Sequence, residues 1–250
     1  MCTLAFAVRP TAGVTLAVTG NRNEFLARPA APPRVWADLP GVLMPRDEKA
    51  GGTWLGLTAG GLFVCVTNRR GAAPDPVRRS RGLLVVDALR AGSVATVREL
   101  CSALPPDRYN GFHLVFADAR EAGVAICDGE RMEVRALAPS EAHLVTERSY
   151  GAGAGVREAE VMREVAPLLL DPGVTAAKLR PPMQRHGPSP LEGACVHADE
   201  LGYGTRSSIQ LVLRTSGAQL LWTQGHPCTE RPSDLSDAAT ALISGAGNPS

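Results

Sequence analysis

Residues 1–19 read MCTLAFAVRPTAGVTLAVT, which is two apolar segments separated by a turn. Residues 4–8 form a continuous apolar run, and residues 9–13 supply Arg-Pro-Thr-Ala-Gly, a typical turn composition. In residues 14–19, apolar side chains alternate with threonine and alanine, as in a strand with one buried face. The pattern predicts a β-hairpin at the very start of the chain, with Cys2 at the head of its first strand.

The same pattern recurs three times further along the chain. Tight turns join apolar segments within residues 53–67, 112–136 and 208–223. Apolar residues at helical spacing occur in two separate blocks, residues 82–104 and 156–170. Because strands join neighbouring strands and the helices form blocks of their own, we predict an α+β protein with antiparallel sheets.

The C-terminal half contains two less regular segments. Residues 171–206 carry five prolines without a clear period, and such a long connection usually forms a lid, a binding loop or disorder. Residues 229–250 are mostly small and polar. We therefore expect one domain over residues 1–228, followed by a flexible C-terminal tail over residues 229–250.

Composition excludes several classes of protein. Lys and Arg number 26 against 25 Asp and Glu, so no net positive field favours binding to nucleic acid or to an acidic membrane surface. No stretch approaches the roughly 18 uninterrupted apolar residues of a membrane span, and the N-terminus lacks the basic region of a secretory signal. The six cysteines form no disulfide scaffold or zinc-finger pattern, which favours a cytoplasmic protein.

Cys2 is a candidate nucleophile. If Met1 is removed, Cys2 carries both a thiol and a free α-amine, and the ordinary pKa of an α-amine, about 7.7–8.0, suits a general base near neutrality. Nucleophile and base would then belong to one residue. The alternative is that Cys2 is simply a small apolar residue at the start of a buried strand.

Polar residues beyond the predicted strands are candidates for the same site. Arg22 could lower the pKa of the Cys2 thiol and hold an anionic intermediate, while Asn23 and Glu24 could orient the amine. Asn68 could donate to an oxyanion, and Arg206 is a second arginine in a glycine-rich turn. The alternative is that these residues are solvated strand exits and turns.

Metal ligands are suggested only weakly by the sequence. Cys195 and His197 could supply two soft ligands for zinc or haem iron, but two residues do not complete a site. His143, His186 and His226 have no partner at ligand spacing along the chain. We therefore predict no metal site and no required cofactor.

Seven short blocks occur in one order along the chain. They are Met1-Cys2-Thr3, Asn21-Arg22-Asn23-Glu24-Phe25, Gly51-Gly52-Thr53-Trp54-Leu55-Gly56, Thr67-Asn68, Ser80-Arg81-Gly82, Tyr109-Asn110-Gly111-Phe112 and Tyr203-Gly204-Thr205-Arg206-Ser207-Ser208. Together they resemble the NRDE family, named for its Asn-Arg-Asp-Glu motif and also called the Transport and Golgi organisation protein 2 family. The resemblance runs from Met1 to about Thr223. It implies an N-terminal-nucleophile (Ntn) hydrolase-like fold, a four-layer αββα sandwich with two antiparallel sheets between helical layers.

The resemblance also implies a chemistry. Cys2 matches the nucleophile of related cysteine amidases such as penicillin V and bile-salt acylases. The expected activity is hydrolysis of a linear, non-peptide C–N bond in a small-molecule amide, with Arg22 and Arg206 as electrostatic partners and Asn68 as oxyanion donor. The blocks also supply four candidate ligand-binding residues: Trp54, Asn110, Tyr203 and Thr205.

The chain departs from the family motif at one position. Asn23 stands where the family has Asp, and an amide cannot hold an α-ammonium or accept a proton as a carboxylate does. Either Glu24 takes that part, or this member is not a competent hydrolase.

The resemblance leaves a second function open, because family members are linked to haem trafficking and to lipid and acyl-CoA metabolism. In this alternative the chain is a non-enzymatic carrier that binds haem or an acyl lipid, with arginines meeting carboxylates or phosphates. The possible iron ligands in the sequence are Cys2, Cys195, His197 and His226.

Overall fold

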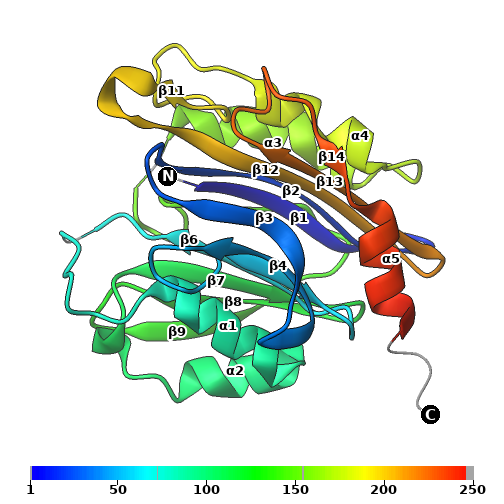
Figure 1. Cartoon of the computed structure of the whole chain (residues 1–250), viewed down its shortest axis with the longest axis horizontal. Coiled ribbons are helices and arrows are strands. Elements are labelled where there is room, and N and C mark those ends of the chain that lie inside the picture. Colours follow the sequence, from blue (N-terminus) through cyan, green and yellow to red (C-terminus); the bar gives the residue numbers. More distant parts are fainter. Residues whose placement is uncertain (1, 72, 154, 246–250) are drawn as a thin grey trace. The chain divides into compact units, whose positions relative to one another are not determined.

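The computed structural model divides the chain into two compact units, each of which is described by itself. The residues described are 2–71, 73–153 and 155–245. The first unit comprises residues 1–28, 139–146 and 154–240, and the second comprises residues 29–138, 147–153 and 241–250. Each unit holds an antiparallel sheet with helices, so the predicted α+β class with two antiparallel sheets is confirmed (Figure 1).

The sheet of the first unit has seven strands among the described residues, in the order β10-β1-β2-β12-β13-β14, with β11 also pairing with β12. These strands are β1 (Cys2–Thr11), β2 (Val14–Phe25), β10 (His143–Thr146), β11 (His197–Ala198), β12 (Tyr203–Arg214), β13 (Gly217–Gln224) and β14 (Ser233–Asp234). The predicted N-terminal hairpin is confirmed as β1 and β2, and the predicted hairpin at residues 208–223 is β12 and β13.

Strand β2 is longer than the sequence pattern predicts. The pattern places residues 21–24 after the strand, but the ladder continues through them to Phe25. Asn21 and Arg22 lie between β1 and β12, with Arg22 opposite both Cys2 and Ser207, while residues 23–25 pair with β12. Backbone pairing, rather than the character of the side chains, keeps this polar stretch extended.

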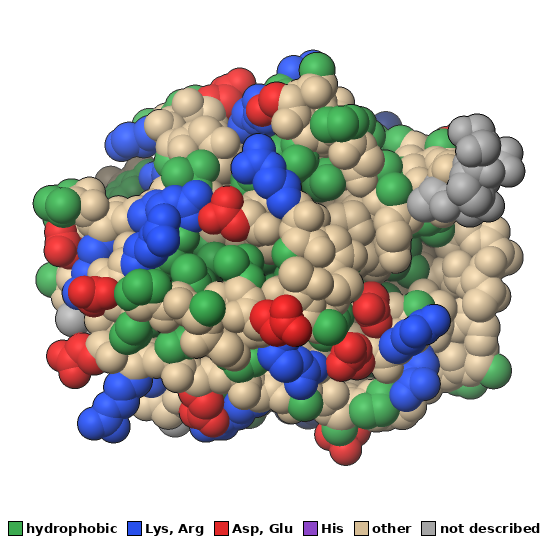
Figure 2. Space-filling model, turned by 90° about the horizontal axis from the view of Figure 1, so that it is seen from below, with side chains coloured by type: hydrophobic (Ala, Val, Ile, Leu, Met, Phe, Trp, Pro, Cys, Tyr) green, Lys and Arg blue, Asp and Glu red, His purple; other side chains and the backbone are tan. Residues whose placement is uncertain are grey.

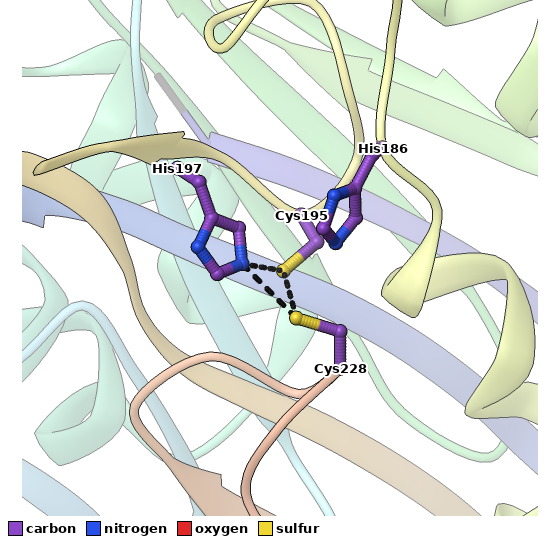
Figure 3. Close-up of side chains that lie close together, drawn as sticks. All are labelled: His186, Cys195, His197 and Cys228. Carbon is purple, nitrogen blue, oxygen red and sulfur yellow. Dashed lines mark hydrogen bonds between the residues drawn. The ribbon is translucent and has the colours of Figure 1, made fainter.

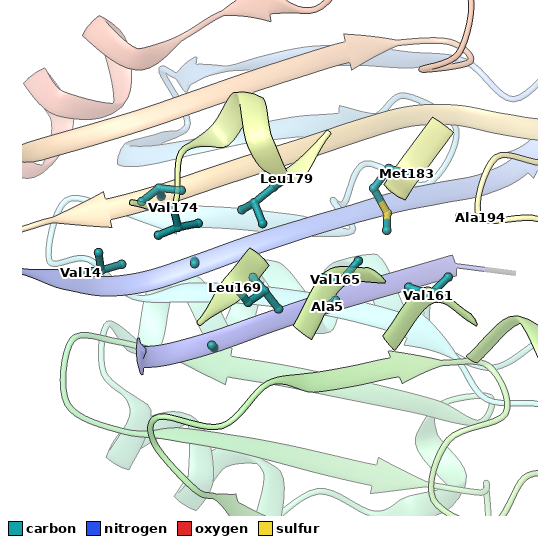
Figure 4. Close-up of a cluster of buried hydrophobic side chains, with 12 residues drawn as sticks. Ala5, Val14, Val161, Val165, Leu169, Val174, Leu179, Met183 and Ala194 are labelled. Atoms are coloured by element: carbon teal, nitrogen blue, oxygen red, sulfur yellow. The ribbon is translucent and has the colours of Figure 1, made fainter. Parts of the chain in front are cut away.

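Helices α3 (Val156–Leu169) and α4 (Ala176–Leu179) cover one face of the first sheet (Figure 1). Alanines on β1 and β2 form the floor of the contact, and their small side chains let the helices approach the sheet closely. The buried side chains packed together there, drawn in Figure 4, are Ala5, Ala7, Val14, Ala17, Val161, Val165, Leu169, Val174, Leu179, Met183, Ala194 and Val212. Two 3-10 turns, η2 (Pro181–Gln184) and η3 (Asp199–Leu201), complete the connection to β12.

The second unit holds a seven-stranded sheet within its described residues, and its strands pair in sequence order. They are β3 (Ala30–Trp36), β4 (Leu39–Asp47), β5 (Leu55–Thr58), β6 (Phe63–Asn68), β7 (Phe112–Ala117), β8 (Ala122–Cys127) and β9 (Met132–Leu137). Strands β5 to β9 confirm the predicted hairpins. The β3–β4 hairpin was not predicted, because Pro32, Pro33, Pro40 and Pro45 obscure its strand pattern.

Two helices pack on this second sheet, α1 (Arg81–Ala91) and α2 (Val94–Ser102), followed by the turn η1 (Pro106–Arg108). The sequence suggested one helical block, but Gly92 ends α1 with a left-handed φ of 79°. Ser93 is the N-cap of α2, since its side chain accepts a hydrogen bond from Thr96 N. Close backbone approach at Gly52 is also observed, because a Cβ there would lie 2.4 Å from Gly82 C.

The segment predicted as a tail contains regular structure up to residue 245. Strand β14 pairs with β13, and helix α5 (Ser236–Gly245) follows it. Leu235 N donates to Leu220 O, the Thr240 hydroxyl accepts from Ala218 N, and Ala239 is fully buried. These contacts anchor the start of the segment on β13. Residues 246–250 lie outside the described part of the chain.

The surface carries both signs of charge. Figure 2 shows Lys and Arg side chains interspersed with Asp and Glu over the face that it views, in keeping with the near-neutral composition. Within the described residues, no helix combines the length and the apolar character needed to cross a bilayer.

Leu169 tests the packing of α3 on the first sheet. Leu169→Ala should lower the free energy of unfolding by about 2–5 kcal/mol, because its side chain is fully buried in the cluster of Figure 4. The neighbouring Leu170→Ala, at a position 36% exposed, is the matched control and should cost less than about 1 kcal/mol. Chemical denaturation of both variants measures the difference, and equal costs would contradict the packing described.

Candidate functional site

Cys2, Arg22 and Ser207 form one row across three strands of the first sheet. Cys2 on β1 lies directly opposite Arg22 on β2, and Arg22 lies opposite Ser207 on β12. Residues directly opposite in antiparallel strands project their side chains from the same face. The half-buried thiol of Cys2 therefore shares a face with a guanidinium that is only 7% exposed.

Glu24 belongs to the same face, because it lies two residues beyond Arg22 along β2. Its Oε2 lies 3.6 Å from Arg22 Nη2 and 4.0 Å from Arg28 Nε. Its Oε1 accepts a hydrogen bond from Phe25 N. A buried guanidinium needs a nearby anion to offset the loss of water, and Glu24 supplies one.

Asn21 and Asn23 project from the opposite face of β2, where the helices pack. Asn21 Nδ2 donates to Met183 O and to Ala194 O, both at 2.8 Å. Asn23 Oδ1 accepts from Thr205 Oγ1 at 2.7 Å. The structure therefore brings Glu24 and Arg22 to the face of Cys2, and it places the Asn23 side chain on the other face.

Thr205, Tyr203 and Arg206 surround the end of β2. The Thr205 hydroxyl accepts from Val196 N at 2.8 Å, so it links Asn23 to the long connection before β12. The Tyr203 hydroxyl donates to Asn23 O, and its ring meets Phe25 edge-on. Arg206 is the extra residue at a β-bulge, and its Nη2 donates to Arg28 O at 3.0 Å.

The remaining predicted site residues belong to the second unit. Trp54 is 9% exposed, and its carbonyl accepts from Val66 N. Asn68 is the exposed last residue of β6. Asn110 exchanges two hydrogen bonds with the backbone of Asp75, beside a cavity of about 100 Å³. Met1, whose removal the expected mechanism requires, lies outside the described residues.

Ser207 is a candidate site residue that the sequence did not single out. It is 2% exposed, and its hydroxyl has no hydrogen-bond partner among the described residues. It lies opposite Arg22 on the face that carries Cys2. In the sequence, Ser207 is only one of two serines that follow Arg206. The bulge that places its side chain on this face is a backbone feature that the sequence does not reveal.

A cluster of cysteines and histidines lies elsewhere in the first unit, where the sequence suggested only a pair. His186, Cys195, His197 and Cys228 converge, with each donor atom within 4.8 Å of the others (Figure 3). Cys195 Sγ lies 3.5 Å from His197 Nε2 and 3.6 Å from Cys228 Sγ, and His197 Nε2 lies 3.0 Å from Cys228 Sγ. The His226 ring stacks on His197 at 3.8 Å.

Burial alters the acid–base character of this cluster. It raises the pKa of the Cys195 thiol to about 12, and the hydrogen bond with Cys228 acts in the same direction. Burial lowers the pKa of His197, and the charges of His226 and His186 lower it as well. His197 is therefore held in the neutral form near pH 7.

Comparisons with known proteins identify relatives by sequence. The family model described as Transport and Golgi organisation 2 matches residues 1–158. The Transport and Golgi organization protein 2 homolog of Bos taurus is 35% identical over 134 residues, which are 50% of this chain and 48% of that protein. The Homo sapiens homolog is 33% identical over 118 residues, which are 45% and 42% of the two chains. The match thus spans about half the length of these curated relatives.

Comparison with solved structures identifies a shared fold. The structure resembles the Caenorhabditis elegans N-acylethanolamine-hydrolyzing acid amidase ortholog, with a TM-score of 0.56 over 84% of this chain and 92% of that chain. Only 11% of the aligned residues are identical, so the likeness concerns the fold alone. The Ntn-hydrolase-like fold implied by the sequence blocks is confirmed.

Thr205 tests the link between β2 and the long connection. Thr205→Val should destabilise the protein by about 1–3 kcal/mol, because it removes the partner of both Asn23 Oδ1 and Val196 N in a fully buried position. Thr215→Val, at an exposed turn position, is the control and should change stability by less than about 0.5 kcal/mol. Thermal and urea unfolding of the two variants provide the measurement, and indistinguishable stabilities would contradict this role.

Proposed function

The chain belongs to the Transport and Golgi organisation 2 family, and on that premise we propose that it is a cysteine amidohydrolase acting on a linear, non-peptide C–N bond. The observation that carries the proposal is the position of Cys2 at the head of β1, directly opposite the buried Arg22. The fold likeness to an acid amidase supports the same reaction class.

The proposed reaction proceeds through a thioester. The α-amine of Cys2 takes the thiol proton, and the sulfur attacks the carbonyl carbon of the amide. The resulting tetrahedral oxyanion collapses, the C–N bond breaks, and the leaving amine receives the proton from the α-ammonium. Water, deprotonated by the same α-amine, then attacks the thioester, which releases a carboxylic acid and restores the thiol.

Four further residues support this chemistry in the proposal. The Arg22 guanidinium stabilises the thiolate electrostatically, and Glu24 holds Arg22 in position at 3.6 Å. Arg206 is the second cation of the site, and Asn68, a residue of the second unit, stays a prediction as oxyanion donor. In this proposal Glu24 is the carboxylate of the site, while Asn23 accepts a hydrogen bond from Thr205 on the opposite face.

The substrate class we propose is an N-acyl amide of a small amine. The structural neighbour is named as hydrolysing N-acylethanolamines, and these compounds contain the required linear C–N bond. Tyr203 and Thr205 fix the backbone of β2 through Asn23, so in this proposal they shape the site. Trp54 and Asn110 belong to the second unit and stay predictions as ligand-binding residues.

Cys2 provides the direct test. Intact-mass measurement should show a chain that begins at Cys2, and a mechanism-based thiol probe should label Cys2 ahead of the other five cysteines. Against a panel of N-acylethanolamines, Cys2→Ala should lower kcat/KM by about 10³-fold or more. Cys101→Ala, a buried cysteine of α2, serves as control and should retain activity within a few-fold.

Two outcomes would overturn the amidohydrolase proposal. A purified chain that retains Met1 would have its amine on the wrong residue. A chain that begins at Cys2, turns over no amide of the panel and instead binds haemin or an acyl lipid would support the carrier function.

An isosteric pair of variants separates the roles of Asn23 and Glu24. Glu24→Gln should lower kcat/KM by about tenfold or more, since it removes the anion beside Arg22. Asn23→Asp should change kcat/KM less than about threefold, because its Oδ1 faces Thr205 and a carboxylate accepts the same hydrogen bond. Steady-state kinetics on both variants checks this, and the reverse order of effects would assign amine handling to residue 23.

A further inference from the structure

We propose that His186, Cys195, His197 and Cys228 form a structural zinc site in the first unit. The four residues come from three separate segments of the chain, namely the loop after η2, the segment entering β11 and the loop after β13. Their donor atoms all lie within 4.8 Å of one another, and Figure 3 shows the four side chains gathered together.

The spacing of the donor atoms fits tetrahedral zinc. With Zn–S bonds of about 2.3 Å and Zn–N bonds of about 2.0–2.1 Å, tetrahedral geometry separates two sulfurs by about 3.8 Å and a sulfur from a nitrogen by about 3.6 Å. The observed distance between Cys195 Sγ and Cys228 Sγ is 3.6 Å, and that between Cys195 Sγ and His197 Nε2 is 3.5 Å. The third distance, from His197 Nε2 to Cys228 Sγ, is 3.0 Å and would lengthen by about 0.6 Å around the ion. Three of the four corners of the tetrahedron therefore lie close to their required positions.

His186 supplies the fourth corner. Its ring lies 4.8 Å from the His197 ring, and its donor atom lies within 4.8 Å of the other three. The residue is exposed, so rotation of its side chain can close the remaining distance of about 1 Å at small cost.

The backbone around the ligands is fixed by contacts outside the cluster. Cys195 N donates to Arg185 O, and His197 N donates to Pro190 O. On the other side, Arg180 Nη2 donates to Pro227 O and to Glu230 O, which holds the loop that carries Cys228. The backbone that carries Cys195, His197 and Cys228 is thus held by the fold before any cation binds, which reduces the entropy cost of binding.

The choice of ligands favours zinc over two other uses of the cluster. A disulfide between Cys195 and Cys228 would engage the two sulfurs only, whereas His197 Nε2 approaches both sulfurs as well. Haem iron takes at most two axial ligands from the protein, whereas here four donors converge on one point. Two thiolates and two imidazoles form a closed tetrahedral set, which is typical of structural zinc.

The site would stabilise the end of the first sheet. The pairing of β13 with β12 ends at Ser207, and β11 pairs with β12 at Tyr203 and Gly204. Zinc bound here would connect three segments: the loop after η2, the segment that enters β11 and the loop that follows β13. It is independent of the proposed hydrolysis, because Cys2, Arg22 and Glu24 contribute no ligand.

The direct test is metal content and the spectrum of a cobalt derivative. The full chain, expressed with Zn²⁺ and purified under reducing conditions, should carry one zinc per chain by elemental analysis. Exchange with Co²⁺ should give the intense ligand-field bands of a tetrahedral site together with thiolate-to-cobalt charge-transfer bands. Zinc removal from the wild-type chain by a chelator should lower its Tm, and added Zn²⁺ should restore it.

Matched variants assign the ligands. Cys195→Ser, Cys228→Ser and His186→Ala should each lower zinc affinity at least about tenfold. His226→Ala and Cys101→Ala are the controls and should retain zinc, since neither belongs to the four-residue set.

Three results would overturn the zinc site. The first is a wild-type chain that stays folded but binds neither Zn²⁺ nor Co²⁺ at micromolar concentration. The second is a Co²⁺ spectrum without thiolate charge transfer. The third is a Cys195–Cys228 disulfide in a chain purified with Zn²⁺ and reductant. Loss of zinc in His226→Ala with retention in His186→Ala would overturn the assignment of the fourth ligand.

Discussion

The burial of β2 between β1 and β12 is the constraint on which the first unit depends. A central strand must pair its backbone, and the polar end of β2, residues 21–24, does so with β12 throughout and with β1 as far as Arg22. Each polar side chain must then find a partner on its own face. Arg22 meets Glu24 on the face of Cys2, and Asn21 meets the backbone of Met183 and Ala194 on the other. One strand therefore supports the candidate site and also anchors the long connection.

The departure from the family motif at Asn23 has a physical explanation in this arrangement. Alternation along β2 directs residue 23 toward Thr205, where the interaction observed requires an acceptor oxygen and no charge. A negative charge is required one position further on, next to Arg22, and Glu24 supplies it. The amide at position 23 is thus compatible with the proposed chemistry.

The sequence predicted the elements whose patterns are local. The N-terminal hairpin and the hairpins of β5 to β9 follow from alternation and turn residues, and the seven motif blocks predicted the fold. The β3–β4 hairpin was not predicted, because its prolines mask the alternation of buried and exposed residues. The cluster of histidines and cysteines was not predicted for a different reason. Cys228 lies far along the chain from Cys195, and their loops come together because β11 and β13 both pair with β12.

The bulge at Arg206 sets which side chains of β12 share a face. Thr205 pairs with Asn23 and Ser207 with Arg22, so one extra residue separates two neighbouring pairs. If Arg206 instead joined the ladder and paired with Arg22, Ser207 and every later position of β12 would shift by one partner, and each side chain would move to the opposite face. Val212 would then turn away from the helices, and the side chains of β12 that now face the helices would lie on the face of Cys2. The number of residues in this motif block therefore matters to the structure as much as their identities do, because together they set which side chains share a face.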